Sequence, residues 1–235
     1  MKRHLKRLRS PRFWSISKKA SKWATKPRPG PHGTFESIPL LVVVRDILEL
    51  ADDGKEAKSI IKMNEIRVDG KDRSDHKYPV GLMDIVSVSK LKKHYVVLPT
   101  NKGLELVEIQ AKDSKQKLCK IENKRSVAGG KVSLNLHDGS NVRIDGSEGV
   151  KYSTGDSIMI DLDGKKITKH FKLDKGNVVI VTKGKNMGKR GRIEDVIVTK
   201  TKEPTKVMCD MDGEKMEVIK DYVLVIGEKE PILNV

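Results

Sequence analysis

The chain has 235 residues, with 48 lysines and arginines against 32 aspartates and glutamates and a formal net charge of +16. This charge indicates a nucleic-acid or anionic-membrane partner, while the lack of a run of about 18 apolar residues excludes a bilayer-spanning helix. The two cysteines, Cys119 and Cys209, are far apart in sequence. They indicate neither a disulfide scaffold nor a zinc knuckle and favour a reducing, intracellular compartment.

The first 35 residues hold eleven of the lysines and arginines and no acidic residue. Phe13, Trp14 and Trp23 lie among these cations, where aromatic rings can stack on bases. We therefore predict a nucleic-acid-binding arm over residues 1–37 that folds only on its partner. Two alternatives stay open: a cleavable organelle presequence and a merely solvated arm. The expected contacts are Lys2, Arg3, His4, Lys6, Arg7, Arg9, Arg12, Trp14, Lys18, Lys19 and Lys22.

Residues 38–64 predict two short helices. Pro39 suits the first turn of the first helix, the Asp53-Gly54 pair ends it, and the second helix covers residues 55–64. The apolar positions with helical spacing are Leu40, Leu41, Val44, Ile47, Leu48 and Ala51 in the first helix and Ala57, Ile60 and Ile61 in the second. Residues 66–89 then alternate as two strands, IRV and DIVSV, around a long basic loop, which predicts a hairpin.

Beyond residue 90 the sequence predicts strands. Alternating runs are separated by Asp-Gly pairs, and Asp-Gly between such runs is the strongest short hairpin signal. The pairs occupy positions 138–139, 145–146, 163–164 and 212–213, and the runs are YVVL, LELVEI, KVSLNL, NVRI, SIMIDL, KITKHFKL, VVIV, RIEDVIV, KVMCDM and YVLVI. The predicted fold class is therefore α+β, mostly β.

A basic, glycine-rich loop, VTKGKNMGKRGRI, occupies residues 181–193. It is not an NTPase phosphate loop, because Arg190 stands where that loop needs a hydroxyl for magnesium and because a strand, not a helix, follows it. Such a hairpin offers backbone amides and cations to a polyanion, and we expect positive φ at Gly184, Gly188 and Gly191. The alternative is that the glycines only turn the chain. The expected contacts are Lys185, Asn186, Lys189, Arg190 and Arg192.

No catalytic or metal-binding arrangement is recognisable in the sequence. The six histidines are scattered and have no cysteine partner at metal-ligand spacing. His137 and Asp138 are adjacent, but Asp138-Gly139 is explained as a turn. We therefore expect no enzymatic activity, no metal and no cofactor.

The helix-helix-hairpin unit at residues 38–89 resembles the small RNA-binding module shared by a small-subunit ribosomal protein, tyrosyl-tRNA synthetases, pseudouridine synthases and a heat-shock protein. The loop at 181–193 is similar to the KOW motif of ribosomal proteins and transcription elongation factors. The whole chain resembles the archaeal and eukaryotic small-subunit ribosomal proteins of the S4e family. The motifs that carry this resemblance include IPLL at 38–41, YPVGLMD at 78–84, LNLHDG at 134–139 and GKNMGKRG at 184–191.

This resemblance implies a structural constituent of the small ribosomal subunit that binds rRNA, stabilises its folded form and catalyses no reaction. The implied partners are small-subunit rRNA and neighbouring ribosomal proteins, with no membrane and no small-molecule substrate. The implied location is the ribosome in the cytoplasm. The alternative function is a transcription or translation factor that uses a KOW-like module to bind RNA or protein.

Four parts are expected along the chain: a basic rRNA-binding arm at 1–37, a helix-helix-hairpin RNA-binding module at 38–90, a central β domain at 91–173 and a KOW-like (SH3-like) small β-barrel at 174–235. In the second part, cations from the helices and the hairpin can form one basic face, since residues four apart share a helical surface. The residues expected on this face are Arg45, Lys58, Lys62, Arg67, Lys71 and Arg73.

Overall fold

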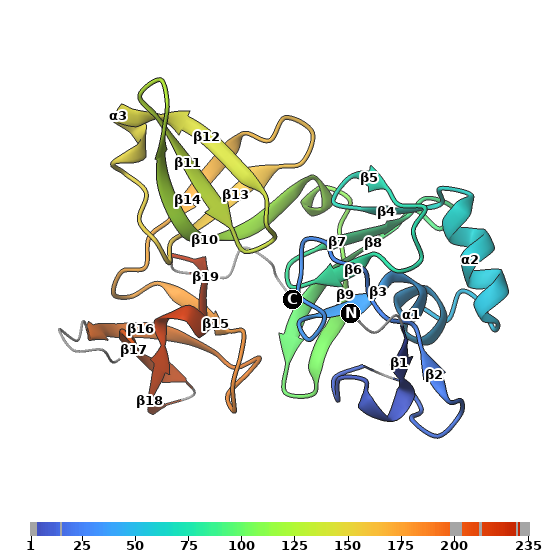
Figure 1. Cartoon of the computed structure of the whole chain (residues 1–235). Coiled ribbons are helices and arrows are strands. Elements are labelled where there is room, and N and C mark those ends of the chain that lie inside the picture. Colours follow the sequence, from blue (N-terminus) through green and yellow to red (C-terminus); the bar gives the residue numbers. More distant parts are fainter. Residues whose placement is uncertain (1–3, 15, 198–203, 212, 229, 231–235) are drawn as a thin grey trace. The chain divides into compact units, whose positions relative to one another are not determined.

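The structure, a computed structural model, describes residues 4–14, 16–197, 204–211, 213–228 and 230. The chain divides into two compact units: unit 1 contains Met1–Leu98 and Lys102–Lys115, and unit 2 contains Pro99–Asn101 and Gln116–Val235. Strands dominate both units and the helices are short (Figure 1), which confirms the predicted mostly-β class. Among the described residues, no helix is long and apolar enough to cross a membrane.

Unit 1 contains short helices and three sheets. The helices are η1 (Arg7–Arg9), α1 (Leu40–Val42), η2 (Val43–Ile47), α2 (Gly54–Lys62) and η3 (Asp113–Lys115). The strands are β1 (Leu5–Lys6), β2 (Trp23–Ala24), β3 (Ser37–Pro39), β4 (Ile66–Val68), β5 (Lys71–Asp72), β6 (Pro79–Gly81), β7 (Ile85–Val88), β8 (Lys93–Thr100) and β9 (Gly103–Ile109). They form one five-stranded sheet, β5-β4-β7-β8-β9, and the pairs β1-β2 and β3-β6.

The first predicted helix ends earlier than expected. α1 passes directly into η2, a wider π-type turn in which the Leu48 N–H donates to the Val43 carbonyl at 2.9 Å. Glu49 then has a φ of 51°, and a left-handed residue ends a helix. The predicted extension to Ala51 is therefore wrong. Pro39 has extended geometry and precedes the helix rather than lying in its first turn.

The second predicted helix is confirmed as α2 and begins one residue early, at Gly54. Ala57 and Ile61 are buried, so the apolar face of α2 packs into unit 1 and its lysines stay exposed. The predicted strands IRV and DIVSV correspond to β4 and β7, which are neighbours in the sheet. Between β4 and β5 the chain reverses through Asp69 and Gly70, which both have positive φ, as a tight two-residue hairpin requires.

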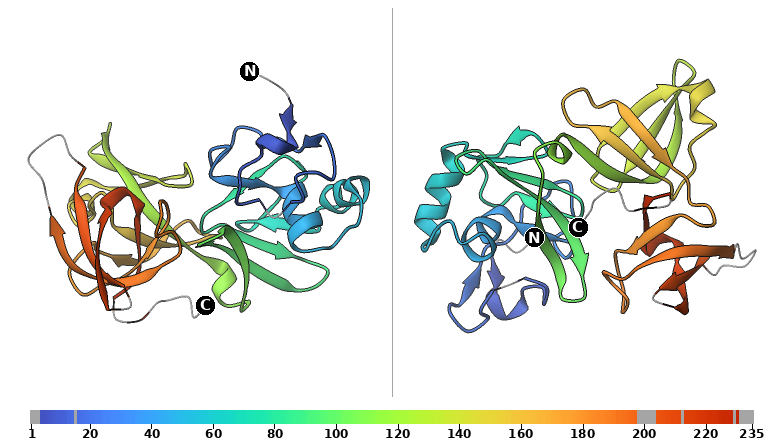
Figure 2. Two further views of the ribbon diagram at one scale, coloured as in Figure 1. Left: turned by 90° about the horizontal axis from the view of Figure 1, so that it is seen from below. Right: turned by 180° about the vertical axis from the view of Figure 1, so that it is seen from behind.

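Unit 2 consists of two five-stranded sheets, with a single-turn helix α3 (Gly146–Gly149) and the short η4 (Lys220–Tyr222). The strands of the first sheet are β10 (Gln116–Val127), β11 (Lys131–Leu136), β12 (Asn141–Asp145), β13 (Ser157–Asp161) and β14 (Ile167–Phe171). Those of the second sheet are β15 (Val178–Val181), β16 (Arg190–Ile197), β17 (Lys206–Met211), β18 (Glu214–Ile219) and β19 (Val223–Gly227). The strand orders are β12-β11-β10-β13-β14 and β18-β17-β16-β15-β19, and every pair is antiparallel. Figure 2 shows these strands from two further sides.

Two of the four predicted Asp-Gly turns are confirmed as hairpin turns. The pairs at 138–139 and 163–164 join β11 to β12 and β13 to β14. The pair at 145–146 instead leads into α3, so the hairpin predicted there is wrong. In the pair at 212–213, Gly213 has a φ of 83° in the connection between β17 and β18, and Asp212 lies outside the described residues.

Candidate nucleic-acid interface

The basic arm is anchored within unit 1 by Trp14. Its indole ring is 2% exposed, and its Nε1–H donates to the Ser37 carbonyl at 2.9 Å. Ile16 is also buried, and Phe13 packs so closely on Gly103 that a Cβ there would collide with it. These side chains of the arm thus pack on protein groups, and folding of the arm only on its partner stays a prediction. The structure corrects the base-stacking role predicted for Trp14, because its ring is enclosed by protein.

The expected arm cations fall into two groups. The Arg7 guanidinium is buried and donates to the Ser17 carbonyl and, at 3.1 Å, to the Ser21 hydroxyl, so this side chain holds the arm together instead of facing RNA. Lys18 is half-buried and donates to the Ser10 carbonyl at 3.2 Å. The exposed cations whose side chains make no hydrogen bond or ion pair within the described part of the chain are Lys6, Arg9, Arg12, Lys19 and Lys22.

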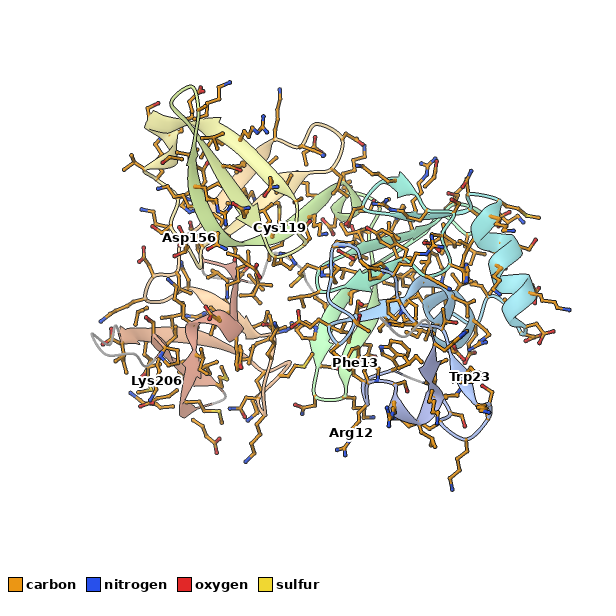
Figure 3. All side chains as sticks on the ribbon, in the orientation of Figure 1. Arg12, Phe13, Trp23, Cys119, Asp156 and Lys206 are labelled. Carbon is orange, nitrogen blue, oxygen red and sulfur yellow. The ribbon has the colours of Figure 1, made fainter. Side chains whose placement is uncertain are left out.

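Two aromatic side chains of the arm are exposed: Phe35 and, next to basic residues, Trp23 (Figure 3). It is 49% exposed, its ring centre lies 5.5 Å from that of His4, and the Lys22 ammonium lies 5.4 Å from it. An exposed ring beside a cation can stack on a base. Trp23 was not among the expected contacts, although its place among lysines and arginines in the sequence is a signal that could have identified it. Lys2 and Arg3, which were expected, lie outside the described residues.

The six cations expected on the helix-hairpin face differ in whether their side chains are bound to other protein groups. Arg45 is half-buried and bound to Asp46 at 2.8 Å, and Arg67 is paired with Asp72 at 2.7 Å. Arg73 stacks 4.2 Å over a tyrosine ring, and its Nε is buried without a hydrogen bond. These three are thus engaged with protein groups. The exposed members that make no hydrogen bond or ion pair with described residues are Lys58, Lys62 and Lys71.

His76 reports a concentration of positive charge beside α2. Its pKa is lowered, first because burial desolvates the imidazolium and next because Lys58 opposes its protonation. Lys77 and Arg28 act in the same direction, while Asp75 partly offsets them. Cations from α2, the β5–β6 connection and the end of the arm therefore lie within electrostatic reach of one side chain. Of these three cations, only Lys58 was among the contacts expected from the sequence.

The loop between β15 and β16 needs its glycines for different reasons. Gly184 and Gly188 have φ angles of 91° and 85°, as predicted. A Cβ on Gly188 would also lie only 2.6 Å from the Cα of Thr100. Gly191 does not have positive φ, so that prediction is wrong: it lies within β16, where a Cβ would lie 2.4 Å from the carbonyl oxygen of Asp210.

The polar side chains of this loop stay accessible. Gly188 donates to the Val181 carbonyl at 2.8 Å, and Val181 donates to the Lys189 carbonyl at 3.0 Å, so the strands stay paired up to the loop. Asn186 and Lys189 are half-buried, while the other expected contacts are exposed. Within the described part of the chain, the members that make no ion pair are Lys185, Lys189 and Arg190.

The adjacent residues His137 and Asp138 form a turn. The Asp138 carboxylate accepts hydrogen bonds from the amide and hydroxyl of Ser140, at 2.9 and 2.6 Å, and from Lys117 at 3.1 Å. Burial raises the pKa of Asp138, but Lys117 and Ser140 outweigh it and lower the value to about 2. His137 Nδ1 accepts from the Lys120 amide at 3.2 Å. Among the described residues, no three His, Cys, Asp or Glu side chains are grouped to hold a metal.

Two family models match the chain. The model described as "Ribosomal family S4e" matches residues 91–167, and the "RS4NT (NUC023) domain" matches residues 1–34. A crystal structure titled as the 30S ribosomal protein S4e from Thermoplasma acidophilum is similar, with a TM-score of 0.71 and 27% identity. The similarity covers 82% of this chain and 96% of that one.

Relatives of known name match the chain over nearly its whole length. "Small ribosomal subunit protein eS4" of Archaeoglobus fulgidus is 44% identical over 97% of this chain and 94% of the relative. The proteins of the same name from Methanocaldococcus jannaschii and Ignicoccus hospitalis are 42% and 41% identical over 99% of this chain, and over 97% and 94% of the relatives. The chain therefore belongs to ribosomal family S4e.

Proposed function

We propose that this protein is a structural constituent of the small ribosomal subunit, which binds rRNA and stabilises its folded form. The observation that carries the proposal is the match, over 97–99% of the chain, to proteins named small ribosomal subunit protein eS4. The partners are small-subunit rRNA and neighbouring ribosomal proteins, and the location is the ribosome in the cytoplasm. No catalytic step, cofactor or small-molecule substrate belongs to this role.

The proposal includes a division of labour along the chain. The arm at 1–37 and the helix-helix-hairpin module at 38–90 bind rRNA, the central β domain at 91–173 follows, and residues 174–235 act as a KOW-like small barrel. The order β18-β17-β16-β15-β19, with the glycine-rich loop between β15 and β16, supports the last assignment. The exposed lysines of α2 and β5 support the second.

The proposed rRNA contacts are expected side chains that the fold leaves partly or fully accessible, together with Trp23; Arg67 is omitted because it is paired with Asp72. Such side chains bind phosphates and release counterions, and this term dominates the affinity of proteins for nucleic acids. Arg7 and Trp14 are left out because the fold encloses them. The residues retained are His4, Lys6, Arg9, Arg12, Lys19, Lys22, Trp23, Lys58, Lys62, Lys71, Lys185, Lys189, Arg190 and Arg192.

Salt extraction of ribosomes tests the proposed function. Small subunits are purified, washed at high salt and separated on a sucrose gradient, and the protein is quantified in each fraction. A structural constituent stays with the subunit in a fixed ratio to rRNA. Release by the wash, as for a loosely bound factor, would contradict the proposal.

A charge reversal tests the loop separately. Lys189→Glu with Arg190→Glu should shift the free energy of unfolding by less than about 0.5 kcal/mol, because neither Lys189 in the loop nor Arg190 at the start of β16 makes an ion pair with a described residue. The same variant should enter small subunits poorly. The control is Lys165→Glu with Lys166→Glu, an equal charge change in the exposed β13–β14 turn. Equal incorporation of the two variants would leave the loop as a simple turn.

A further inference from the structure

Three neighbouring strands of unit 2 carry a polar face that the proposed function does not use. β11 lies between β10 and β12 (Figures 1 and 2). Val132, Leu134 and Leu136 of β11 point into the core, so the alternate residues of β11 point outward. We call this surface the sheet face: it is the outward side of β11, of β12 and of the second half of β10.

The outward residues form rows across the three strands. Arg125 is paired with Ser133, which is in turn paired with Arg143. Residues directly opposite in antiparallel strands share a face, and adjacent strands are about 4.8 Å apart, so the two arginines flank the serine with their backbones about 10 Å apart. Lys131 adds a third cation at the end of β11.

The next row is made of three asparagines. Asn123 is paired with Asn135, and Asn135 with Asn141. The outer two are exposed, whereas the Oδ1 atom of Asn135 is buried and has no hydrogen-bond partner within the described chain. A buried amide oxygen without a donor is costly. Rotation of the two exposed amides that flank it would open Asn135 to a donor from a partner.

The charged groups of the sheet face are also without partners. Arg125, Lys131 and Arg143 are exposed and make no ion pair with the described residues. Asp145 is the single carboxylate in these rows, opposite Lys131, so the face is net positive. The arrangement therefore fits a polyanion that also offers hydrogen-bond donors.

Three classes of partner are distinguished by the composition of the face. Protein interfaces have an apolar, aromatic-rich core, but Val127 is the one apolar outward residue in these rows. Single-stranded RNA is bound by stacking on aromatic rings, and the face has none. Duplex RNA is bound by shape, through phosphates and 2′-hydroxyls across its wide, shallow minor groove, and a row of amides beside a row with two arginines suits that groove.

We propose that the sheet face docks on the minor groove of an A-form RNA duplex. Arg125 and Arg143 contact phosphates, while the amides of Asn123, Asn135 and Asn141 bond to 2′-hydroxyls and base edges. This inference rests on the proposed function, which places the chain among folded rRNA. It adds an RNA surface at residues 123–145, where no contact was expected from the sequence.

The phosphate contacts are tested by the salt dependence of binding of the full-length protein to an RNA duplex of about 16 base pairs, the span of a double-strand RNA-binding domain. Arg125→Gln with Arg143→Gln should reduce the slope of log K against log salt by about 0.9 for each phosphate that the variant no longer neutralises. The matched control is Lys165→Gln with Lys166→Gln, which removes equal charge from an exposed turn of the same sheet. Equal slopes for the two variants would overturn the phosphate contacts.

The amide contacts are tested by comparing RNA and DNA duplexes of one sequence. Asn123→Ala with Asn141→Ala changes exposed side chains only, so a thermal melt should match that of the unsubstituted protein. The variant should lose part of the preference for RNA while its affinity for DNA stays the same. An unchanged preference would overturn the role of the 2′-hydroxyl.

The third test places the face in the assembled particle. A photoreactive amino acid in place of Ser133, between the two arginines, should crosslink to a base-paired segment of rRNA. The inference would be overturned by a crosslink to a protein or by the absence of any crosslink, provided that the unsubstituted chain remains on salt-washed subunits. Loss of that chain from the subunits would instead contradict the proposed function, and the two duplex assays would still decide the sheet face.

Discussion

Two tryptophans of the arm have opposite environments at the scale of single residues. Trp14 is enclosed and hydrogen-bonded to Ser37, whereas Trp23 is half exposed beside Lys22 and His4. Burial of an aromatic side chain supports the fold, and exposure of one beside cations supports binding. The two positions therefore separate the structural role of the arm from its proposed role in RNA binding.

Trp14→Ala should lower the free energy of unfolding by about 3–5 kcal/mol, the range for removing a buried aromatic side chain. Trp23→Ala should change it by less than about 0.5 kcal/mol but weaken RNA binding by about 1–3 kcal/mol if its ring stacks on a base. Urea titrations and RNA titrations of both variants measure these effects. Equal stabilities for the two variants would show that the arm is not packed through Trp14.

The pKa of His76 should respond to the charges around it. Lys58→Gln removes a cation that disfavours the imidazolium, so the pKa of His76 should rise in the free protein. RNA phosphates near Lys58, Lys77 and Arg28 should raise it as well. NMR titration of the imidazole C–H protons, with and without RNA, measures both effects. A pKa unaffected by RNA would remove this part of α2 from the interface.

At the scale of elements, the β15–β16 loop is fixed by close approach as well as by φ. Gly176 and Gly188 have nearly equal φ angles, 88° and 85°, but a Cβ on Gly176 would meet nothing within 4 Å. Gly188→Ala should therefore cost about 1–3 kcal/mol more than Gly176→Ala, the usual cost of overpacking. Denaturant unfolding of the two variants gives this difference, and equal costs would contradict the close approach to Thr100.

Lys120 links β10 to η4 by donating from Nζ to the carbonyls of Lys220 and Asp221, at 3.0 and 2.8 Å. Burial lowers its pKa to about 8 from the usual 10.5, although Asp221 and Glu122 oppose the shift. Between these values the unfolded chain binds more protons than the folded chain, so stability rises with pH. Below a pH of about 8, Lys120 is protonated in both the folded and the unfolded chain, so the free-energy cost of burying its charge lowers the stability fully.

The Lys120→Met variant has no ammonium group at this position, so the titration of Lys120 is absent from it. The difference in free energy of unfolding between the unsubstituted protein and the variant should therefore shift in favour of the former as pH rises from about 8 to 10.5. Urea titrations across this window measure the difference, and other titrating groups cancel because both proteins contain them. Parallel pH profiles would show that the ammonium is not buried in solution.

The elements that the sequence predicts are those with a regular apolar period. α2, the β4–β7 pair and the strands flanking the confirmed Asp-Gly turns all have one. β10, the longest strand that the structure describes, was not predicted from the sequence. Its residues Glu122–Val127 are all exposed, and apolar and polar residues do not alternate along them. β18 was also missed, because half of its sequence, EKMEVI, is polar and the apolar residues do not alternate regularly with the polar ones.

The basic character of the site could be predicted from sequence, but the use of each side chain could not. Eleven cations in the first 35 residues identify the arm. The enclosure of Trp14 depends on Ser37, and the rows of the sheet face depend on the register of three strands. Contacts of this kind bring together positions distant along the chain, and no local pattern encodes them.

At the scale of the whole molecule, the net charge is +16 and each unit carries basic surfaces. They are the arm, the lysines of α2, the β15–β16 loop and the sheet face. A protein with several basic surfaces can hold different segments of one folded RNA, which is how the proposed stabilisation of rRNA would arise. A factor that contacts RNA through its loop alone has no need of the other surfaces.

Crosslinking in cells, followed by purification of the protein and sequencing of the attached RNA, tests this account most directly. We predict that small-subunit rRNA dominates the recovered RNA, with crosslinks at several segments that include a duplex. Charge-neutralising variants of one surface should remove crosslinks at its own segment only. Recovery of mRNA in place of rRNA, or of no RNA above background, would contradict the account and favour a factor.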